Sequence, residues 1–363
     1  MKSLGEILEY EQPTKYIVKS ENYDDSYATP VLTPGQTFIL GYTDEKEGIY
    51  SDPLPVIIFD DFTTATKLVN FPFKVKSSAM KILKPANKNV YIPYWYYYLS
   101  SLKVDNDLHK RYWISTFAPR QVNSPSFTEQ KRIAERLDKV QELIALQKKQ
   151  LKKLDELIKS RFIDLFGDPI TNPKGWPIKK LKDCSVEKKL SYGSGASAIE
   201  YNQKIRYIRI TDINDNGMLN GEVVSPSFVE DKYILNKGDI LFARSGATVG
   251  KTFLYKESYG PCIYAGYLIR LIPDQSCCLP VYIFYFTKTD YYRNFVNSKQ
   301  KVVAQPNINA QEYGNLLIPV PSMQRQTQFA DFVTKIEAQK GLLTTRLTHL
   351  ETLYKSLMQE YFG

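Results

Sequence analysis

The chain has 363 residues, of which 43% are hydrophobic and 24% charged, and its net charge at pH 7 is +9. At about 150 residues per domain this length predicts two or three domains, and the composition excludes a disordered or collagen-like chain. No run of about 18 apolar residues occurs, so no membrane span is predicted. The N-terminal residues lack the apolar region of a signal peptide. The 4 Cys and 2 His are too few and too badly spaced to predict a metal site, and we expect reduced thiols in a cytoplasmic protein.

Aromatic residues make up 13% of the chain, with 27 tyrosines. Positive charge interleaved with tyrosine suits a nucleic-acid surface, although tyrosine also fills sheets and protein interfaces. The net charge is 0 over residues 1–127, +3 over 128–167, +5 over 168–320 and +1 over 321–363. If the first segment binds an anionic polymer, it must therefore concentrate its basic side chains on one face.

The first predicted domain covers residues 1–124. Short β-branched and aromatic runs at 56–59 and 71–75 predict strands. An aromatic segment, 93–98, follows them. We interpret this region as a mixed α/β unit with a twisted, mainly antiparallel sheet.

Residues 125–167 predict one long helix with no proline after Pro125. Eight of ten positions spaced alternately four and three apart are apolar in the series Ile133, Leu137, Val140, Ile144, Gln147, Leu151, Leu154, Ile158, Arg161 and Leu165. A sustained 4-3 spacing is typical of a coiled-coil seam. Ser126, or Thr128 with Glu129, offers an N-cap, and Gly167 offers a stop.

Residues 168–320 predict a second mixed α/β unit that parallels the first. Strands are predicted at 206–210, 240–242 and 267–272, with the turn Asp215-Asn216-Gly217 between the first two. The run at 179–181 parallels 2–4, and the run at 238–243 parallels 55–59. The aromatic run that begins at Pro280 parallels the run that begins at Pro93.

Residues 321–363 repeat residues 125–167 without a gap, at a constant offset of 196. Thirteen of the 43 positions are identical: Pro125/Pro321, Ser126/Ser322, Gln130/Gln326, Ala134/Ala330, Lys139/Lys335, Leu146/Leu342, Leu151/Leu347, Leu154/Leu350, Leu157/Leu353, Lys159/Lys355, Ser160/Ser356, Phe166/Phe362 and Gly167/Gly363. Nine of ten positions of the second seam are apolar: Phe329, Val333, Ile336, Lys340, Leu343, Leu347, Leu350, Tyr354, Leu357 and Tyr361. Two core helices of separate domains are the alternative, but length, a narrow stripe and solvated faces favour a coiled coil within the chain.

Connectivity favours antiparallel helices, because the second would then begin where the first ends, with residues 168–320 as a compact body at that point. The predicted class is α+β. Two mixed α/β domains are separated by two long helices that form an antiparallel intramolecular coiled coil with pseudo-two-fold symmetry.

Residues 245–252 resemble a phosphate-binding loop, but Ser245 stands where the first glycine of that pattern is needed. We interpret the segment as a glycine-rich turn that presents polar and basic side chains. No acid–base, nucleophilic or metal constellation is evident, so no catalytic residue is predicted.

The whole pattern resembles the specificity subunit of type I restriction–modification systems. The residues that carry the resemblance are the segments 125–134 and 151–154, the segment 238–246, and the segments 305–309 and 317–321. The resemblance implies a non-catalytic subunit whose two target recognition domains, residues 1–124 and 168–320, each read one half of a bipartite site in double-stranded DNA. The helices at 125–167 and 321–363 would set the spacer and dock two methyltransferase subunits.

The implied partners bring the cofactors: S-adenosylmethionine in the methyltransferase subunits, and ATP and Mg in motor-nuclease (restriction) subunits. No cofactor is expected in this chain, and the location implied is the cytoplasm of a bacterium or archaeon, in a system of phage defence. One departure matters, because Asp60-Asp61 stands in the first unit where the second has Ala243-Arg244. The acidic pair cannot make the contacts of Arg244, so the two half-sites should differ.

Lysine and arginine supply affinity for phosphates, and other contacts read base edges. The DNA-binding candidates of the first unit are Thr63, Thr64, Lys67, Lys74, Lys110 and Arg111. Those of the second unit are Tyr192, Ser194, Arg209, Arg244, Ser245, Thr248, Lys251, Tyr264, Lys299, Lys301 and Gln305. The partner-binding candidates, repeated on polar helix faces, are Lys139, Lys159, Lys335 and Lys355.

Two other functions stay open on the sequence alone. One is a coiled-coil scaffold that joins two protein-binding modules, and its DNA binding would lack a steep salt dependence. The other is an enzyme that uses residues 245–252, and a nucleotide would then raise its melting temperature.

Overall fold

A computed structural model of the chain describes residues 1–34, 37–102, 111–300 and 307–363. The chain divides into two compact units: unit 1 comprises Met1–Lys148 with Thr345–Gly363, and unit 2 comprises Lys149–Thr344. Each long helix therefore contributes one part to each unit. None of the described helices combines the length and the hydropathy that a bilayer crossing requires.

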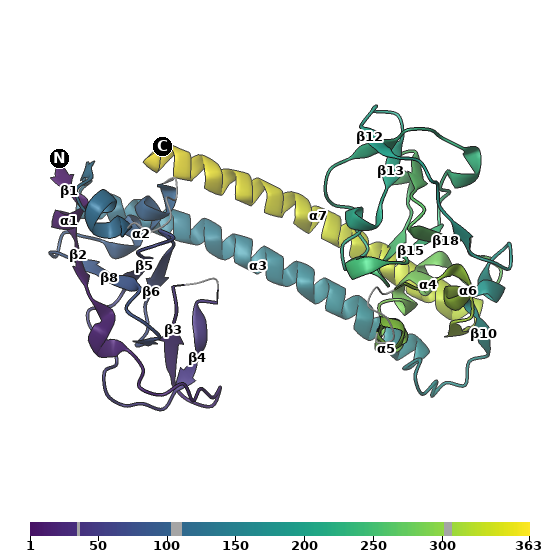
Figure 1. Ribbon diagram of the computed structural model, residues 1–363, viewed down its shortest axis with the longest axis horizontal. Coiled ribbons are helices and arrows are strands. Elements are labelled where there is room, and N and C mark those ends of the chain that lie inside the picture. The colour runs from purple at the N-terminus through teal and green to yellow at the C-terminus, as the bar shows by residue number, and fades with distance from the viewer. Residues whose placement is uncertain (35–36, 103–110, 301–306) are drawn as a thin grey trace. The chain divides into compact units, whose positions relative to one another are not determined.

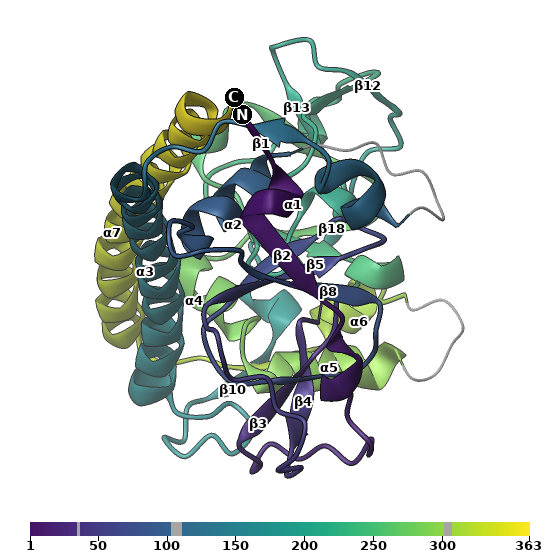
Figure 2. The ribbon, with the colours of Figure 1, turned by 90° about the vertical axis from the view of Figure 1, so that its left-hand side faces the viewer.

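Unit 1 is built on a four-stranded antiparallel sheet in the order β2-β8-β5-β6 (Figures 1 and 2). A second, three-stranded sheet has the order β4-β3-β7, and its strands lie between β2 and β8 in the chain. Its strands are β1 Lys2–Ser3, β2 Leu8–Glu11, β3 Thr29–Leu32, β4 Ile39–Thr43, β5 Val56–Asp60, β6 Thr66–Val69, β7 Lys74–Val75, β8 Met80–Pro85 and β9 Gln121–Val122. Its short helices are α1 Leu4–Ile7, η1 Pro13–Tyr16, α2 Ile92–Ser101 and η2 Trp113–Phe117. All five residues of β5 are buried, as expected for a central strand with both faces covered.

Unit 2 has a four-stranded sheet of matching order, β11-β18-β15-β16, whose pairs are also antiparallel. Its strands are β10 Ile178–Lys180, β11 Ser191–Tyr192, β12 Ala198–Glu200, β13 Arg206–Ile208, β14 Val224–Pro226, β15 Ile240–Ala243, β16 Thr252–Leu254, β17 Cys262–Tyr264, β18 Leu268–Leu271 and β19 Leu317–Pro319. Its helices are η3 Leu181–Cys184, η4 Ile210–Asp212, η5 Asp231–Tyr233, η6 Gly246–Thr248, η7 Glu257–Tyr259, α4 Pro280–Phe286, α5 Asp290–Gln300 and α6 Ala310–Gly314.

The two long helices are α3, Phe127–Phe166, and α7, Met323–Phe362. They pack antiparallel in both units. In unit 1, Arg136 donates to Tyr361 at 2.7 Å, and Lys148 forms an ion pair with Glu351 at 2.9 Å. In unit 2, Lys340 pairs with Asp155 at 2.7 Å, and the rings of Phe162 and Phe329 lie 5.5 Å apart. As α3 numbers rise, their α7 partners fall, and every position of both predicted seams is buried or half-buried.

One buried glutamine on each long helix attaches the sheet-bearing part of its unit. Gln130 Oε1 accepts from the backbone N–H of Tyr91, and Gln130 Nε2 donates to the carbonyl of Asn89. Gln326 repeats both contacts in unit 2, with the N–H of Leu279 and the carbonyl of Cys277.

These contacts fix the correspondence between the aromatic helices. Tyr91 in unit 1 is equivalent to Leu279 in unit 2, so Ile92 and not Pro93 corresponds to Pro280. The sequence alignment of the two prolines is wrong by one residue, because proline is tolerated at either of the first helical positions. The predicted α+β class, with two mixed units and an antiparallel pair of long helices, is confirmed.

Candidate nucleic-acid interface

The polypeptide that leaves the central strand β15 places Arg244 on an aromatic platform. Its guanidinium carbon lies 4.8 Å from the centre of the Tyr192 ring, and its Nε donates to Asn307 Oδ1 at 3.2 Å. Tyr192 is itself held, because its hydroxyl accepts the N–H of Ala310. The hydrogen bond to Asn307 uses Nε, so the two Nη groups, which form the fork that reads guanine, take no part in it. Arg244 is thus a positioned cation at the end of a rigid strand.

The glycine-rich turn that follows Arg244 is fixed by its own backbone. Gly246 has φ +66°, and the Thr248 hydroxyl donates to the carbonyl of Ser245. Thr252, which would supply the metal-binding hydroxyl of a nucleotide loop, is fully buried in β16 and hydrogen-bonds Thr287. A strand and not a helix follows this turn, so it lacks the helix N-terminus on which phosphate loops depend. The geometry therefore argues against the nucleotide-binding alternative.

Lys251, at the far end of the turn, is paired within unit 2. Its Nζ lies 3.0 Å from a carboxylate oxygen of Asp215, whose side chain is 91% exposed. Lys288 donates to the backbone carbonyl of Asp215, and burial lowers the pKa of Lys288 to about 8. A phosphate that contacts Lys251 would compete with this carboxylate.

Two more basic candidates of unit 2 have carboxylate partners. Arg209 binds the buried Asp212 at 2.8 Å, and Lys299 pairs with Glu312 at 3.0 Å. The first pair also closes the η4 turn, because the N–H of Arg209 donates to the same carboxylate. Arg209 is therefore a structural side chain with its charge already matched.

Two predicted contact residues of unit 2 are core residues. Tyr264 is fully buried and its ring packs against Arg270, while Ser194 is 1% exposed and caps the N–H of Ala196. All three residues of β17 are buried, Tyr264 included, and a side chain without exposed surface has no atom to offer a duplex. These two residues are corrections to the predicted list.

In unit 1 the matching turn follows β5 and is closed by acidic side chains that point inward. Asp60 and Asp61 are both nearly fully buried. Asp60 accepts from the hydroxyl of Thr63 and the N–H of Phe62, and Asp61 forms a buried ion pair with Lys81 at 3.5 Å. The acidic pair thus stabilises the turn and presents no charge at the surface.

The other candidates of unit 1 divide by exposure. Thr63, Lys67 and Arg111 are exposed and Thr64 is half-buried. Lys74 is only 1% exposed and pairs with Glu45 at 3.0 Å, so it is a third correction. Its long apolar stem explains the error, because a lysine in a strand can be buried when a carboxylate receives its head. The candidates Lys110, Lys301 and Gln305 lie outside the described residues.

The structure adds residues that the sequence reasoning missed. Tyr267 is 63% exposed, and its carbonyl accepts the N–H of Arg244, so it lies beside the platform. Asn307 orients Arg244 directly. In unit 1, Phe62 is 48% exposed on the turn after β5. Asn307 stands in a segment that the family resemblance already marked, whereas neither aromatic carries a signal that separates it from the neighbouring core aromatics.

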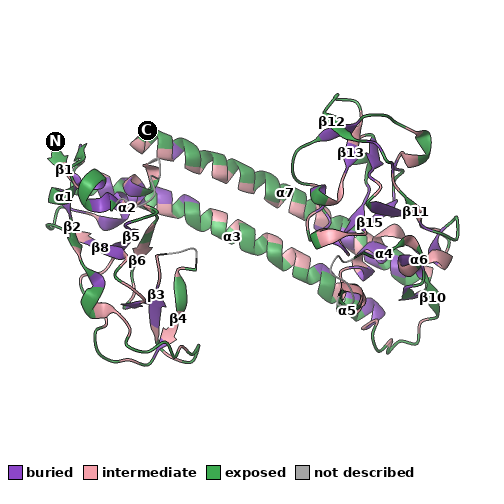
Figure 3. Cartoon of the chain, in the orientation of Figure 1, coloured by how far each residue is buried: buried purple, intermediate pink, exposed green. Residues whose placement is uncertain are grey.

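Long stretches of α3 and α7 are exposed (Figure 3), and the two helices repeat apolar and basic residues among their exposed positions. The four lysine candidates, Lys139, Lys159, Lys335 and Lys355, are all exposed. Among the exposed large apolar residues are two repeated pairs, Leu146 with Leu342 and Leu157 with Leu353. Steps of 7 and 11 residues from Lys139 to Leu146 and then Leu157 return to nearly the same helical angle. The repeat therefore preserves an outer stripe that the seam does not need.

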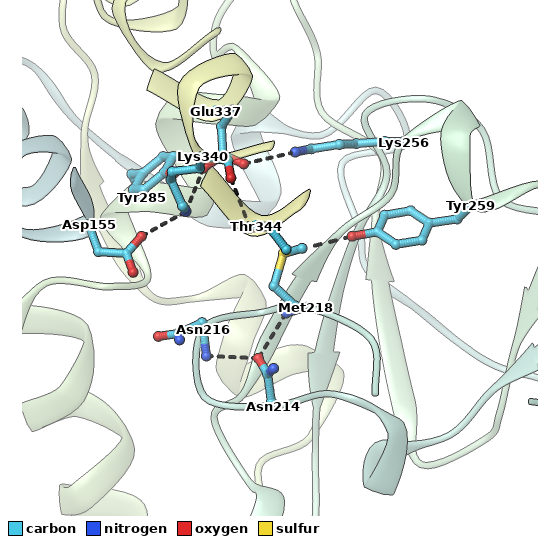
Figure 4. Close-up of polar contacts among 10 residues, drawn as sticks. All are labelled: Asp155, Asn214, Asn216, Met218, Lys256, Tyr259, Tyr285, Glu337, Lys340 and Thr344. Carbon is cyan, nitrogen blue, oxygen red and sulfur yellow. Dashed lines mark hydrogen bonds and ion pairs between the residues drawn. The ribbon is translucent and has the colours of Figure 1, made fainter. Parts of the chain in front are cut away.

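A second attachment in unit 2 joins α7 to the sheet-bearing part (Figure 4). Glu337 receives the hydroxyl of Tyr285 and pairs with Lys256 at 3.7 Å and with Lys340 at 2.9 Å. Unit 1 places Tyr97 and Gln141 in the equivalent positions, where the Tyr97 hydroxyl lies 3.3 Å from Gln141 Oε1. The tyrosine contact is shared, whereas the cationic contacts belong to unit 2.

Comparison with known proteins gives a consistent family. The family described as "Type I restriction modification DNA specificity domain" matches residues 1–156 and 173–352. The specificity subunit of the type I restriction enzyme EcoR124I/EcoR124II from Escherichia coli is 49% identical over 154 residues, 39% of this chain and 38% of that protein. The putative MjaX specificity subunit of Methanocaldococcus jannaschii is 26% identical over 202 residues, 52% of this chain and 46% of that protein. The matched parts thus span less than half of either relative.

A solved structure shares the fold. The crystal structure of a type I restriction–modification S subunit from M. genitalium superposes with a TM-score of 0.68, at 13% identity, over 100% of this chain and 95% of that chain. At this identity the similarity shows the fold alone.

Proposed function

Because the chain belongs to the type I restriction–modification DNA specificity family, we propose that it is the non-catalytic subunit that gives such a complex its specificity for a DNA sequence. The duplication carries this proposal: two sheets of the same strand order, each attached to a long helix by a buried glutamine. Two equivalent bodies on one chain suit a site with two halves. Residues 1–124 would read one half and residues 168–320 the other.

Arg244 is the base-reading residue that we propose for the second half-site. An arginine can grip guanine with two hydrogen bonds from its Nη groups, and such a pair discriminates by about 1–3 kcal/mol. Stacking on Tyr192 and the bond to Asn307 remove rotamers that binding would otherwise have to order. Ser245, Thr248 and the exposed Tyr267 lie on the same end of unit 2 as further candidates.

In unit 1 the proposed contacts come from exposed residues of the turn after β5 and from neighbouring cations. These residues are Thr63, Thr64, Lys67 and Arg111. Since the acidic pair of this turn is buried, a duplex would meet hydroxyls and the Phe62 ring there, with no carboxylate. We therefore expect a different base preference from each unit.

The long helices are proposed to set the spacer and to dock the methyltransferase subunits. A helix of 40 residues is about 60 Å long, which exceeds the roughly 34–36 Å of one DNA turn. Deleting one heptad from each helix, 147–153 with 343–349, should shorten the recognised spacer by several base pairs. An unchanged spacer would contradict the proposed role of the helices.

The outer stripe is the proposed docking surface. It occurs once on each long helix, so the two helices together offer one copy to each of two methyltransferase subunits. Leu146→Glu with Leu342→Glu should abolish co-purification with the methyltransferase, because a charge replaces an apolar contact. Leu143→Glu is the matched control: it is also an exposed leucine of α3, but its repeat position holds Gln339. Equal loss of the partner in both variants would remove the repeated leucines from the interface.

Single-molecule mapping of DNA methylation tests the function as a whole. Cells that carry this chain together with its methyltransferase should show a bipartite methyladenine motif, and deletion of this chain alone should erase it. A motif that survives the deletion would overturn the proposal. S-adenosylmethionine, ATP and Mg would be bound by the partner subunits and not by this chain.

A further inference from the structure

Three of the four cysteines converge in unit 2. The sulfur atoms of Cys184, Cys277 and Cys278 all lie within 4.8 Å of one another, although the first is 93 residues before the second in the chain. Cys184 and Cys278 are fully buried, and Cys277 is half-buried and so gives access from solvent. The spacing of the cysteines in the sequence predicts no metal site, because a spacing pattern relates only residues that are close together in the chain.

The backbone around the three thiols is preorganised. The N–H of Asp274 donates to the carbonyl of Cys184 at 2.8 Å. The N–H groups of Cys277 and Cys278 both donate to the carbonyl of Asp274. The turn that holds two of the cysteines is thus bonded directly to the segment that holds the third, and the sulfur positions do not depend on side-chain packing alone.

A cation completes the cluster. Lys179, on β10, places its Nζ 3.3 Å from the sulfur of Cys277. An ammonium group at this distance stabilises a thiolate, the form that binds metal.

The other unit shows that the fold itself needs no sulfur here. Leu4 and Leu181 make equivalent backbone bonds, so Ile7 in unit 1 corresponds to Cys184. By the glutamine contacts, Val90 corresponds to Cys278. Aliphatic side chains fill these positions in unit 1, and both are buried. Sulfur at these two buried positions of unit 2, with the sulfur of Cys277 beside them, therefore indicates a role other than packing.

We propose that Cys184, Cys277 and Cys278 form a three-thiolate site for a thiophilic divalent d10 cation of the zinc class. Metal–sulfur bonds of about 2.3 Å place such sulfur atoms roughly 4 Å apart, so each atom moves by less than about 1 Å. Binding releases the three thiol protons to solvent. The three negative charges, the divalent ion and the Lys179 ammonium then sum to zero, with Lys179 as a hydrogen-bond donor to the Cys277 sulfur.

The three cysteines lie next to the contact that attaches α7 to the sheet-bearing part of unit 2. Gln326, which attaches α7, donates to the carbonyl of Cys277. A bound ion would fasten the η3 segment to the start of α4 at the point where unit 2 is attached to the long helix. This inference concerns the stability of unit 2 and does not depend on the proposed DNA-reading function.

The test uses the full chain, purified with a thiol-free reductant and titrated with Cd2+. We expect one equivalent to bind, with the ultraviolet charge-transfer absorption of Cd–thiolate bonds, and the melting temperature to rise with Cd2+ concentration. Cys184→Ile with Cys278→Val, which installs the unit 1 residues, should fold and lose both signals. Cys262→Ala, the buried cysteine outside the cluster, should keep both.

Because thiolates bind the softer Cd2+ more tightly, Zn2+ should reduce the absorption only when it is added in large excess. The proposal is overturned if the wild-type chain shows no charge-transfer band, or if the band persists in the double variant. It is equally overturned if mass spectrometry finds a disulfide among the three cysteines in chain purified from cells under non-reducing conditions.

Discussion

The turns that follow the two central strands differ far more than the sheets that carry them. After β5 in unit 1, Asp60 and Asp61 turn inward and close the turn with hydrogen bonds and an ion pair to Lys81. After β15 in unit 2, Arg244 turns outward onto Tyr192. The sheet order and the glutamine attachment stay the same. A duplicated scaffold held by buried contacts thus leaves its surface turns free to diverge, which suits the two different half-sites that we propose.

The attachment glutamines should give the largest effect. Gln326→Leu removes the partner of the N–H of Leu279 and of the carbonyl of Cys277, two half-buried groups, and an unpaired polar group costs about 1–3 kcal/mol when it is buried. We expect a loss of about 3 kcal/mol in the free energy of unfolding, and a similar loss for Gln130→Leu. Denaturant unfolding measures both, with the exposed Gln324→Leu as control. A loss in only one variant would show that the two attachments are not equivalent.

Arg244→Ala should weaken recognition of one half-site by about 1–3 kcal/mol, because the bidentate contact is lost. The other half-site, which we propose residues 1–124 read, should keep its preference. The measurement is binding of the reconstituted methyltransferase complex to duplexes altered one half at a time. Arg293→Ala, an exposed arginine paired with Asp290, is the control. Wild-type preference at both halves in the Arg244 variant would remove this residue from the reading surface.

The two turns should respond in opposite directions to glycine exchange. Thr64 has φ +61°, a conformation that costs an L-residue roughly 1–2 kcal/mol, and Gly246 has φ +66° with open space at its Cβ position. Thr64→Gly should therefore stabilise the chain by about 0.5 kcal/mol after the entropy of glycine is subtracted. Gly246→Ala should destabilise it by about 1 kcal/mol. Thermal melts check both signs, and equal signs would contradict the comparison.

Lys251 should give the smallest effect, because its charge is already matched by Asp215. Lys251→Ala should reduce DNA affinity equally for all sequences and lower the salt slope by about one. Asp215→Ala should raise affinity slightly, since it removes the carboxylate that competes with phosphate. Salt titrations of the reconstituted complex measure both variants. A sequence-dependent effect of Lys251→Ala would mean that it reads bases.

The long helices and their duplication could be predicted because they depend on periodicity, which is local. A 4-3 spacing of apolar residues buries one face of a helix whatever lies around it, and all seam positions are in fact at least half-buried. The 13 identities of the repeat predicted that both helices would pack alike. Gln130 and Gln326 were visible among those identities, although their role as attachment points was not.

The candidate site was harder, because the sequence does not report which way a strand or turn side chain points. Lys74 and Tyr264 have the residue types of a DNA surface, yet both are buried. Lys74 lies in β7 and Tyr264 in β17. Every residue of these two short strands is buried, so neither strand has an exposed face that a sequence pattern could mark. Asp60-Asp61 could not be assigned to the interior before Lys81 was found opposite.

The amino-acid sequence by itself determined the class of this protein, the order of its parts and the seam of its helices, since these follow from composition, repeats and periods of a few residues. Only the tertiary structure decided which cations are free to meet a duplex, and which carboxylates or thiols stand next to one another. Arg209 and Lys251 meet their carboxylates through turns, and Cys184 meets Cys277 and Cys278 across 93 residues of chain. Such neighbours are set by how strands and turns pack in three dimensions, which no local pattern records.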